Sequence, residues 1–227
     1  MRATRPHNES DCPPIPLVIG PSDEGSSTVA GGTPALHICR WRSPAHPARF
    51  WYKLRFVRVL GVDCGSELTG YGVVEQRNGR GLACISAGVI RLKTRDPLAR
   101  RLARVFEELG SVIRAHRPDV VAIEDVFYAV NAKSALKLGH VRGVAMLAAA
   151  VQDLEVAEYA PLAIKSAVVG YGRAEKSQVQ QMVKRLLNLK ETPEPPDVAD
   201  ALAIAICHLH TAATLERQAA GGRRARR

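Results

Sequence analysis

The pattern of apolar and polar residues predicts an ordered body that begins near residue 57 and contains both strands and helices. Short apolar runs bounded by turn-forming residues are typical of buried strands, and apolar residues spaced three and four apart are typical of helices. Strands are expected at 57–62, 70–75, 82–92, 120–123 and 156–159. Helices are expected at 97–116, 131–151, 163–169, 174–189 and 197–214.

The order of these elements predicts the fold class. Three strands come first, and Asn78-Gly79 between the second and third is typical of a tight hairpin turn. Helices and strands then alternate, as they do where parallel strands are connected by helices. We therefore expect an α/β fold with a mixed five-stranded sheet and helices on both of its sides.

The two ends of the chain differ from this body. Residues 1–55 contain paired prolines and a run rich in Gly and Ser at 20–32, and no hydrophobic period persists there. We expect this extension to be disordered, or to result from a start codon assigned too far upstream. The body is expected to cover residues 56–215 as a single domain, followed by a basic tail at 216–227.

Composition adds a weak indication of the partner. The formal net charge is +10, which favours a polyanion such as nucleic acid, but the two ends carry about two thirds of that excess. No run of 18 apolar residues and no secretory signal is evident, so no membrane association is expected. The five cysteines lack paired CxxC spacing, which argues against disulfides and zinc, and a cytoplasmic location is expected.

Two acidic residues follow predicted strands. Asp63 comes directly after the run 57–62, and Glu124 directly after 120–123. A carboxylate at the end of a buried strand is costly unless it is paired or binds a metal. Simpler interpretations are a turn-forming Asp and a solvated loop acid. Asp125 is an alternative to Glu124, because alternate residues of a strand point to opposite faces.

Two further acids, Asp197 and Asp200, lie three residues apart at the start of the last predicted helix, and so share one face. Capping of the helix N-terminus is a competing interpretation. Acids from two strand ends and a helix start can converge, and hard divalent cations such as Mg²⁺ or Mn²⁺ would relieve their repulsion. Two such ions can activate water and stabilise the leaving oxygen of a phosphodiester, so the set indicates a nuclease site.

At these residues the sequence resembles the RuvC-type crossover junction endodeoxyribonucleases, the bacterial Holliday junction resolvases. The resemblance extends from residue 57 to about residue 213. It is carried by four collinear stretches: GVDCGSELTGYGVV at 61–74, AIEDVFYAVNAKSALKLGHVRGVA at 122–145, VVGYGRAEKSQVQ at 168–180 and DVADALAIAICH at 197–208. It implies a ribonuclease H-like fold.

The resemblance also implies a mechanism and partners. It makes four residues the catalytic acids that bind two Mg²⁺ ions per subunit, with Mn²⁺ able to substitute: Asp63, Glu124, Asp197 and Asp200. Members of the family act as homodimers that nick two opposing strands of a four-way DNA junction symmetrically, in recombination and repair. The branch-migration complex of RuvA and RuvB is the implied protein partner.

Further residues acquire roles through the same resemblance. Phe127 matches an aromatic residue that stacks on a base near the junction centre, although the sequence alone favours a core position. Lys165 and Lys176 match lysines that contact the DNA backbone. Without the resemblance, each would be interpreted as an ordinary solvated lysine. The family's dimer contact uses the region of helix 131–151, whose small residues could equally pack on the sheet: Ala135, Gly139, Gly143 and Ala145.

Two residues depart from the family pattern. Cys64 stands where proline is common, and we interpret it as a passive thiol. Asp125 stands where glutamine is common and adds a carboxylate beside the site.

Three other functions compete. An actin- or sugar-kinase-like ATPase also uses an Asp-x-Gly turn, but it needs a second domain and phosphate loop for which this chain is too short. A non-catalytic junction-binding relative is disfavoured because all four acids are present. A related nuclease with another substrate is excluded by the resemblance and not by the acids.

Overall fold

The computed structural model describes residues 56–77, 81–125 and 132–224. Its ten elements are β1 (Phe56–Asp63), β2 (Leu68–Arg77), β3 (Gly81–Arg91), α1 (Leu98–His116), β4 (Val120–Glu124), α2 (Ala132–Ala150), β5 (Glu155–Tyr159), α3 (Pro161–Val169), α4 (Lys176–Leu186) and α5 (Pro196–Arg224). All five predicted strands and all five predicted helices are present, and apart from the end of α5 their bounds lie within a few residues of those expected.

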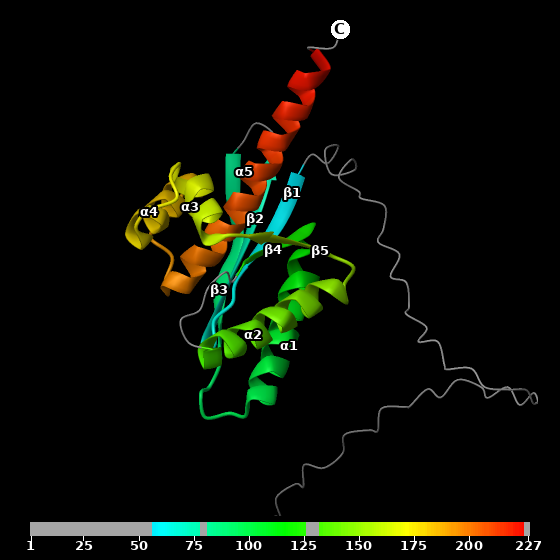
Figure 1. Ribbon diagram of the computed structural model, residues 1–227, viewed down its shortest axis with the longest axis vertical. Helices are drawn as coiled ribbons and strands as arrows, with labels where there is room; N and C mark the ends of the chain where they lie inside the picture. The colour runs from blue at the N-terminus through cyan, green and yellow to red at the C-terminus, as the bar shows by residue number, and fades with distance from the viewer. Residues whose placement is uncertain (1–55, 78–80, 126–131, 225–227) are drawn as a thin grey trace, which may run out of the picture. The chain divides into compact units, whose positions relative to one another are not determined.

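The strands form one mixed sheet in the order β3-β2-β1-β4-β5 (Figure 1). β1 pairs antiparallel with β2, and β2 pairs antiparallel with β3. β4 is parallel to both β1 and β5. Because Val62 pairs with Ile123 in the parallel ladder, the next residues, Asp63 and Glu124, end neighbouring strands at the same edge of the sheet.

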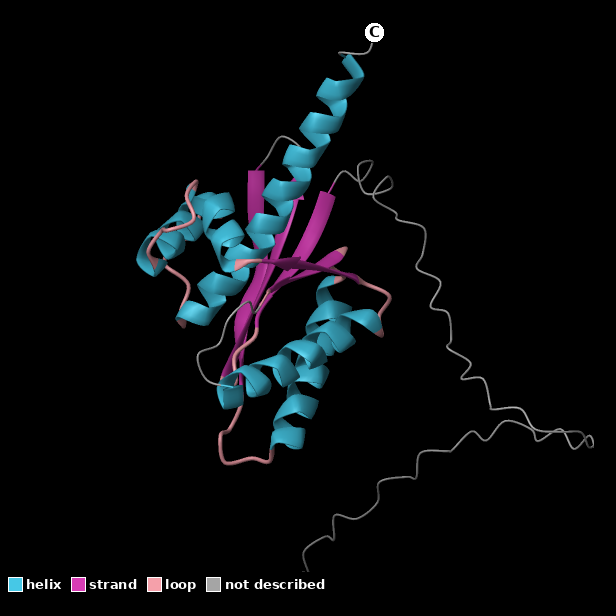
Figure 2. Cartoon of the chain, in the orientation of Figure 1, coloured by secondary structure: helices cyan, strands magenta, loops and turns pink. Residues whose placement is uncertain are grey.

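Helices cover both faces of this sheet, as the element order predicted (Figure 2). Alternate residues of β1 face opposite layers: Leu60 and Val62 pack with α1 and α2, whereas Val59 packs with α3, α4 and α5. Each face therefore has its own apolar core, and the sheet separates the two.

α5 lies unusually close to the sheet because its neighbours there lack side chains. A Cβ atom built on Gly61 would overlap the carbonyl oxygen of Ala201 and would lie 2.7 Å from the amide nitrogen of Ala205. Main-chain atoms of the helix therefore rest directly on main-chain atoms of β1. Only glycine at this position permits that approach.

The helix ends differ most from the predictions. α1 is an exception: it ends at the expected residue, His116, after which Arg117 takes a left-handed conformation, with φ of 46°, and its amide donates to the carbonyl oxygen of Ile113 at 2.8 Å. α5 continues to Arg224, beyond the expected end at residue 214, because alanine and long polar residues favour a helix even where the apolar period stops. Asn78-Gly79 lies outside the described residues. None of the described helices combines the length and apolar character needed to cross a membrane.

Candidate active site

The ends of β1 and β4 place two of the predicted acids on the α5 face of the sheet. Asp63 has the same parity along β1 as Val59 and Gly61, both of which face α5. Glu124 has the same parity along β4 as Ala122, which packs in the core beneath α5. Strand alternation therefore directs both carboxylates towards the layer that carries Asp197 and Asp200.

The start of α5 is held against the end of β1 by a second glycine contact. Gly70 on β2 is the cross-strand partner of Asp63. A Cβ atom built on Gly70 would overlap the carbonyl oxygen of Asp197 and would lie 2.6 Å from its carbonyl carbon. The first turn of α5 is thus seated beside Asp63, and it brings Asp197 and Asp200 to the same edge of the sheet.

Mutual repulsion shows that the four acids share one site. Burial and, in decreasing order, the negative charges of Asp200, Glu124 and Asp197 together raise the pKa of Asp63 to about 7. Burial is also the largest cause that raises the pKa of Glu124, followed by the charge of Asp200. Four acids predicted from separate parts of the sequence therefore interact electrostatically in the folded chain.

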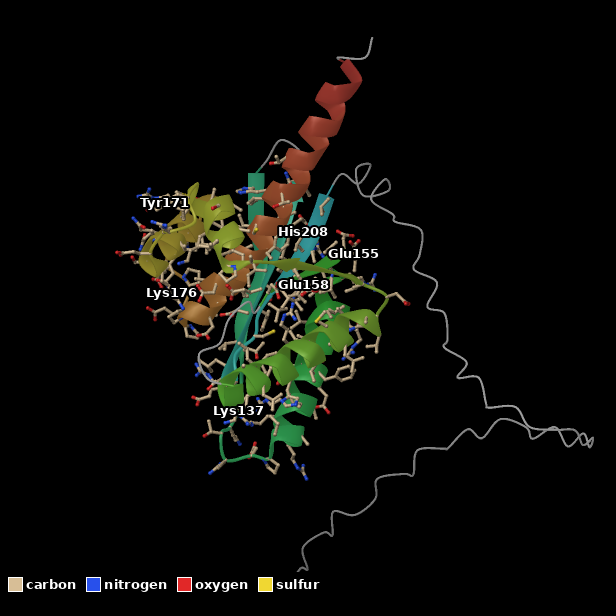
Figure 3. All side chains as sticks on the ribbon, viewed as in Figure 1. Lys137, Glu155, Glu158, Tyr171, Lys176 and His208 are labelled. Carbon is tan, nitrogen blue, oxygen red and sulfur yellow. The ribbon has the colours of Figure 1, made fainter. Side chains whose placement is uncertain are left out.

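Lys176, at the start of α4, partly neutralises this cluster. Its Nζ lies 2.6 Å from Oδ2 of Asp200 (Figure 3 labels Lys176). The hydrogen bond to Asp200 raises the pKa of Lys176, and the charges of Asp63 and Asp197 act in the same direction. The Asp200 carboxylate is thus engaged across two helices, which is more than a helix cap requires.

A cavity is lined by two of the four acids and by both predicted lysines. Its volume is about 190 Å³, and Glu124 and Asp200 line it together with Lys165 and Lys176. Its remaining lining is mainly apolar and comes from α3, α4 and α5: Pro161, Ile164, Val179, Ala203 and Ile204. Lysines suit the negative charge of a phosphodiester, and carboxylates suit a cation between them and that phosphodiester.

The chemistry of this donor set fits a hard divalent cation. The acids offer only oxygen ligands, and their repulsion raises the pKa of Asp63, which a bound cation would relieve. Within the described ranges, no three Asp, Glu, His or Cys side chains stand close enough together to hold one metal ion. In this arrangement the ammonium group of Lys176 compensates Asp200.

The geometry separates Glu124 from Asp125. Asp125 pairs with Arg142 of α2, with 3.3 Å between Oδ1 and Nη2, and so turns to the other face of the sheet. The added carboxylate is thus compensated away from the cavity. Cys64 packs against the core between the sheet, α1 and α2, and burial together with the charge of Asp63 raises the pKa of its thiol to about 12. A thiol that keeps its proton agrees with the passive interpretation.

Phe127 lies outside the described residues, so its predicted stacking role stays a prediction. Sequence reasoning missed three contributors: the glycines at 61 and 70, and Arg142. The glycines carried no signal of their own among the other residues of apolar strands. Arg142 did carry one, because it is charged and sits in a helix otherwise rich in alanine and glycine.

Comparison with known proteins identifies the family. A family model described as crossover junction endodeoxyribonuclease RuvC matches residues 59–208. A protein of that name from Koribacter versatilis is 71% identical over 161 residues, which span 71% of this chain and 97% of the relative. Its counterpart from Acidobacterium capsulatum is 60% identical over 168 residues, spanning 71% of this chain and 98% of the relative.

Solved structures give the same result. A structure of Thermus thermophilus RuvC in complex with a Holliday junction substrate superposes with a TM-score of 0.65 at 30% identity, covering 70% of this chain and 96% of that one. The yeast mitochondrial resolvase Ydc2, at 18% identity and a TM-score of 0.55, shares the fold over 71% of this chain and 81% of its own. These matches confirm the ribonuclease H-like fold, and the chain belongs to the crossover junction endodeoxyribonuclease RuvC family.

Proposed function

We propose that this chain resolves Holliday junctions by nicking two opposing strands of a four-way DNA junction symmetrically, in recombination and repair. One observation carries the proposal: four acids from β1, β4 and α5 interact at one edge of an RuvC-family sheet, beside a cavity that two lysines also line. A nuclease needs carboxylates for cations and lysines for the substrate phosphates, and this site supplies both.

The four acids are the proposed catalytic residues, and together they would hold two Mg²⁺ ions per subunit, with Mn²⁺ able to substitute. When bound, these ions supply an activated water and charge stabilisation for the leaving oxygen. Lys165 and Lys176 bind the phosphodiester near the cavity and orient it. Lys176 then exchanges its partner, because the ammonium group that pairs with Asp200 in the free protein turns to the DNA phosphate.

Symmetric nicking calls for two active sites, and the outer face of α2 is the proposed contact between two subunits. Leu136 and Leu147 are 64% and 52% exposed there, which is high for apolar residues. Between them, nothing lies within 4 Å of a Cβ atom built on Gly139 or Gly143. Apolar side chains that flank small residues allow a second copy of the helix to approach closely.

The proposal also covers Phe127, a protein partner, the location and the two ends of the chain. Phe127 stacks on a base near the junction centre, a sequence-tolerant contact for an exposed aromatic residue. The RuvA–RuvB branch-migration complex is the proposed protein partner, and the cytoplasm is the proposed location. Residues 1–55 and 216–227 are proposed to lie outside the nuclease domain.

The test uses a synthetic mobile four-way junction, labelled in turn on each strand, with the full chain in Mg²⁺. We expect paired nicks at symmetric positions in two opposing strands. Nicks scattered over the arms, or equal cleavage of a matched linear duplex, would indicate a nuclease with another substrate. Junction binding without cleavage would favour a non-catalytic relative, and junction-independent hydrolysis of ATP would favour an ATPase.

A further inference from the structure

Arg142, on the inner side of α2, contacts three acceptors from two neighbouring strands. Its Nε donates to the main-chain carbonyl oxygen of Glu124 at 3.2 Å. Its Nη2 donates to the Asp125 carboxylate at 3.3 Å and to the carboxylate of Glu158 on β5. Only 18% of the Arg142 side chain is exposed, whereas the side chains of Asp125 and Glu158 are 40% and 43% exposed. Figure 3 labels Glu158, which lies beside β5 in this view.

The first of these contacts concerns the carbonyl group of a proposed catalytic residue. Glu124 is the last residue of β4, where the strand ladder ends. Beyond it the chain is fixed by the amide of Asp125, which donates to the carbonyl oxygen of Tyr159 at 2.8 Å. Arg142 therefore holds the peptide group that follows the Cα atom of Glu124. The direction of the Glu124 carboxylate depends on that peptide group.

The second and third contacts concern charge. Asp125 and Glu158 lie close to an edge of the sheet that already holds four mutually repelling acids. One guanidinium compensates both, through a planar fork that a lysine ammonium does not reproduce. The same guanidinium thus compensates two carboxylates on the face of the sheet opposite the four acids.

A second arginine makes a similar contact on the neighbouring strand. Arg101 of α1 donates from Nη1 to the carbonyl oxygen of Ser66 at 3.0 Å, in the turn that follows Asp63. α1 and α2, which cover the face opposite the acids, therefore each send one arginine to a main-chain oxygen near an acid. Arg142 makes the closer contact, because its acceptor belongs to the acid itself.

We propose that Arg142 is a positioning residue for Glu124: it fixes the end of β4 and thereby sets how the Glu124 carboxylate meets the other three acids. The inference rests on the proposed function of those acids. It assigns to α2 a role in the chemistry that is separate from the subunit contact proposed for its outer face.

The test compares Arg142→Met, which keeps the length of the side chain, with Arg142→Lys, which keeps the charge and one donor group. Mn²⁺ affinity of the free protein is measured by electron paramagnetic resonance, and single-turnover cleavage at saturating junction in Mg²⁺. Losing a residue that orients a metal ligand typically costs about 10- to 100-fold. We expect losses of this size for Arg142→Met in both measurements, partial recovery for Arg142→Lys, and unchanged junction affinity without metal.

Two control variants separate positioning from structure. Asp125→Asn removes one charged partner but keeps the bond between Arg142 and Glu124, so it should retain Mn²⁺ affinity. Arg104→Met removes an exposed arginine that pairs only with Glu108 within α1, and should change nothing. If Arg142→Met does not fold, the proposal is tested by comparing the Mn²⁺ affinities of Arg142→Lys and Asp125→Asn: a loss in the first variant alone supports it.

Two results would overturn the proposal. One is wild-type Mn²⁺ affinity in both Arg142 variants. The other is a loss in Asp125→Asn as large as in Arg142→Lys, which would make the ion pair responsible and not the carbonyl contact. Failure of the wild-type protein to cleave junctions would instead contradict the proposed function. The Mn²⁺ measurement contains no DNA, so the two failures are distinguishable.

Discussion

The two faces of the sheet contribute different chemistry to one edge. On the α5 face, side chains supply the site: the four acids and both lysines of the cavity lie on that side. On the face covered by α1 and α2, two arginines supply contacts to main-chain oxygens, at Ser66 and Glu124. One layer carries the reacting groups and the other holds the backbone from which two of them project.

The difference extends to how each layer is packed. α5 touches the sheet through main-chain atoms at Gly61 and Gly70, which leaves no freedom in its height above the strands. α1 and α2 pack through larger side chains such as Val105, Leu109 and Val141, whose rotamers can adjust. We therefore expect the site to be more sensitive to small changes on the α5 face.

The largest expected effect tests the acids themselves. Asp63→Asn removes a metal-binding charge and should lower junction cleavage by at least about 1000-fold, as for an essential member of a catalytic unit. Binding of the junction should persist, because the lysines remain. The control is Asp119→Asn at the opposite end of the sheet, where Oδ2 of Asp119 accepts from the amide of Arg58 at 2.7 Å. Undiminished nicking by Asp63→Asn in Mg²⁺ would contradict the assignment.

The second prediction compares glycines in the two layers. Gly70→Ala forces main-chain atoms of Asp197 to move, and should cost about 1–3 kcal/mol in the free energy of unfolding. Since a displacement of about 1 Å at a catalytic group can cost about 100-fold in rate, cleavage should fall as well. Both are measured on one preparation, by denaturant unfolding and by single-turnover cleavage.

Gly110→Ala, within α1, is the matched control. The nearest atoms to its added Cβ are the tips of flexible side chains, Nη1 of Arg114 at 3.1 Å and Nε2 of Gln152 at 3.8 Å. Alanine is more favourable than glycine inside a helix by about 1 kcal/mol, so stability should hold or rise. Equal losses in the two variants would remove the distinction between the layers.

The third prediction concerns the pH dependence of stability on the α5 face. His208 of α5 lies 2.9 Å from the hydroxyl group of Tyr159 on β5, and burial lowers its pKa from 6.5 to about 4 (Figure 3 labels His208). A lowered histidine pKa means that the folded state resists protonation. The stability from neutral His208 is therefore complete above pH 6.5 and is lost as pH falls towards 4, by about 3 kcal/mol at most.

His208→Gln tests this prediction through the difference in the free energy of unfolding between the wild-type protein and the variant. Denaturant unfolding from pH 7.5 to 4.5, in metal-free buffer, gives the free energy of unfolding of both proteins. Asp63 acts with the opposite sign, because its pKa is raised, but it acts equally in both. The advantage of the wild-type protein over His208→Gln should shrink as pH falls. An advantage that is constant across this range would show that His208 does not titrate as described.

The smallest expected effect comes from the N-terminal extension. Both layers and the sheet lie within the described residues 56–224, so deleting residues 1–55 should leave junction cleavage and thermal stability unchanged. A shift of the unfolding temperature would show that the extension belongs to the domain.

Sequence patterns predicted the elements and their order, because strand and helix periods are local properties of the chain. They also predicted the acids, but the residues alone left Asp125 as an alternative to Glu124. That choice depends on Arg142, a partner 17 residues along the chain, and only the packing of α2 brings the two together. The ion pair between Lys176 and Asp200 could not be predicted from local patterns either, since it joins the starts of two helices.

The glycine contact beneath α5 has a consequence for how this enzyme tolerates variation. Main-chain atoms, which every amino acid has, set the distance between α5 and the strands. Side-chain substitutions on α5 therefore do not change that distance. Side-chain changes in the surrounding core therefore have little effect on where the acids lie relative to one another. Their placement remains sensitive at glycines of the sheet that face the helix, such as Gly61 and Gly70, where an added methyl group would overlap main-chain atoms of α5.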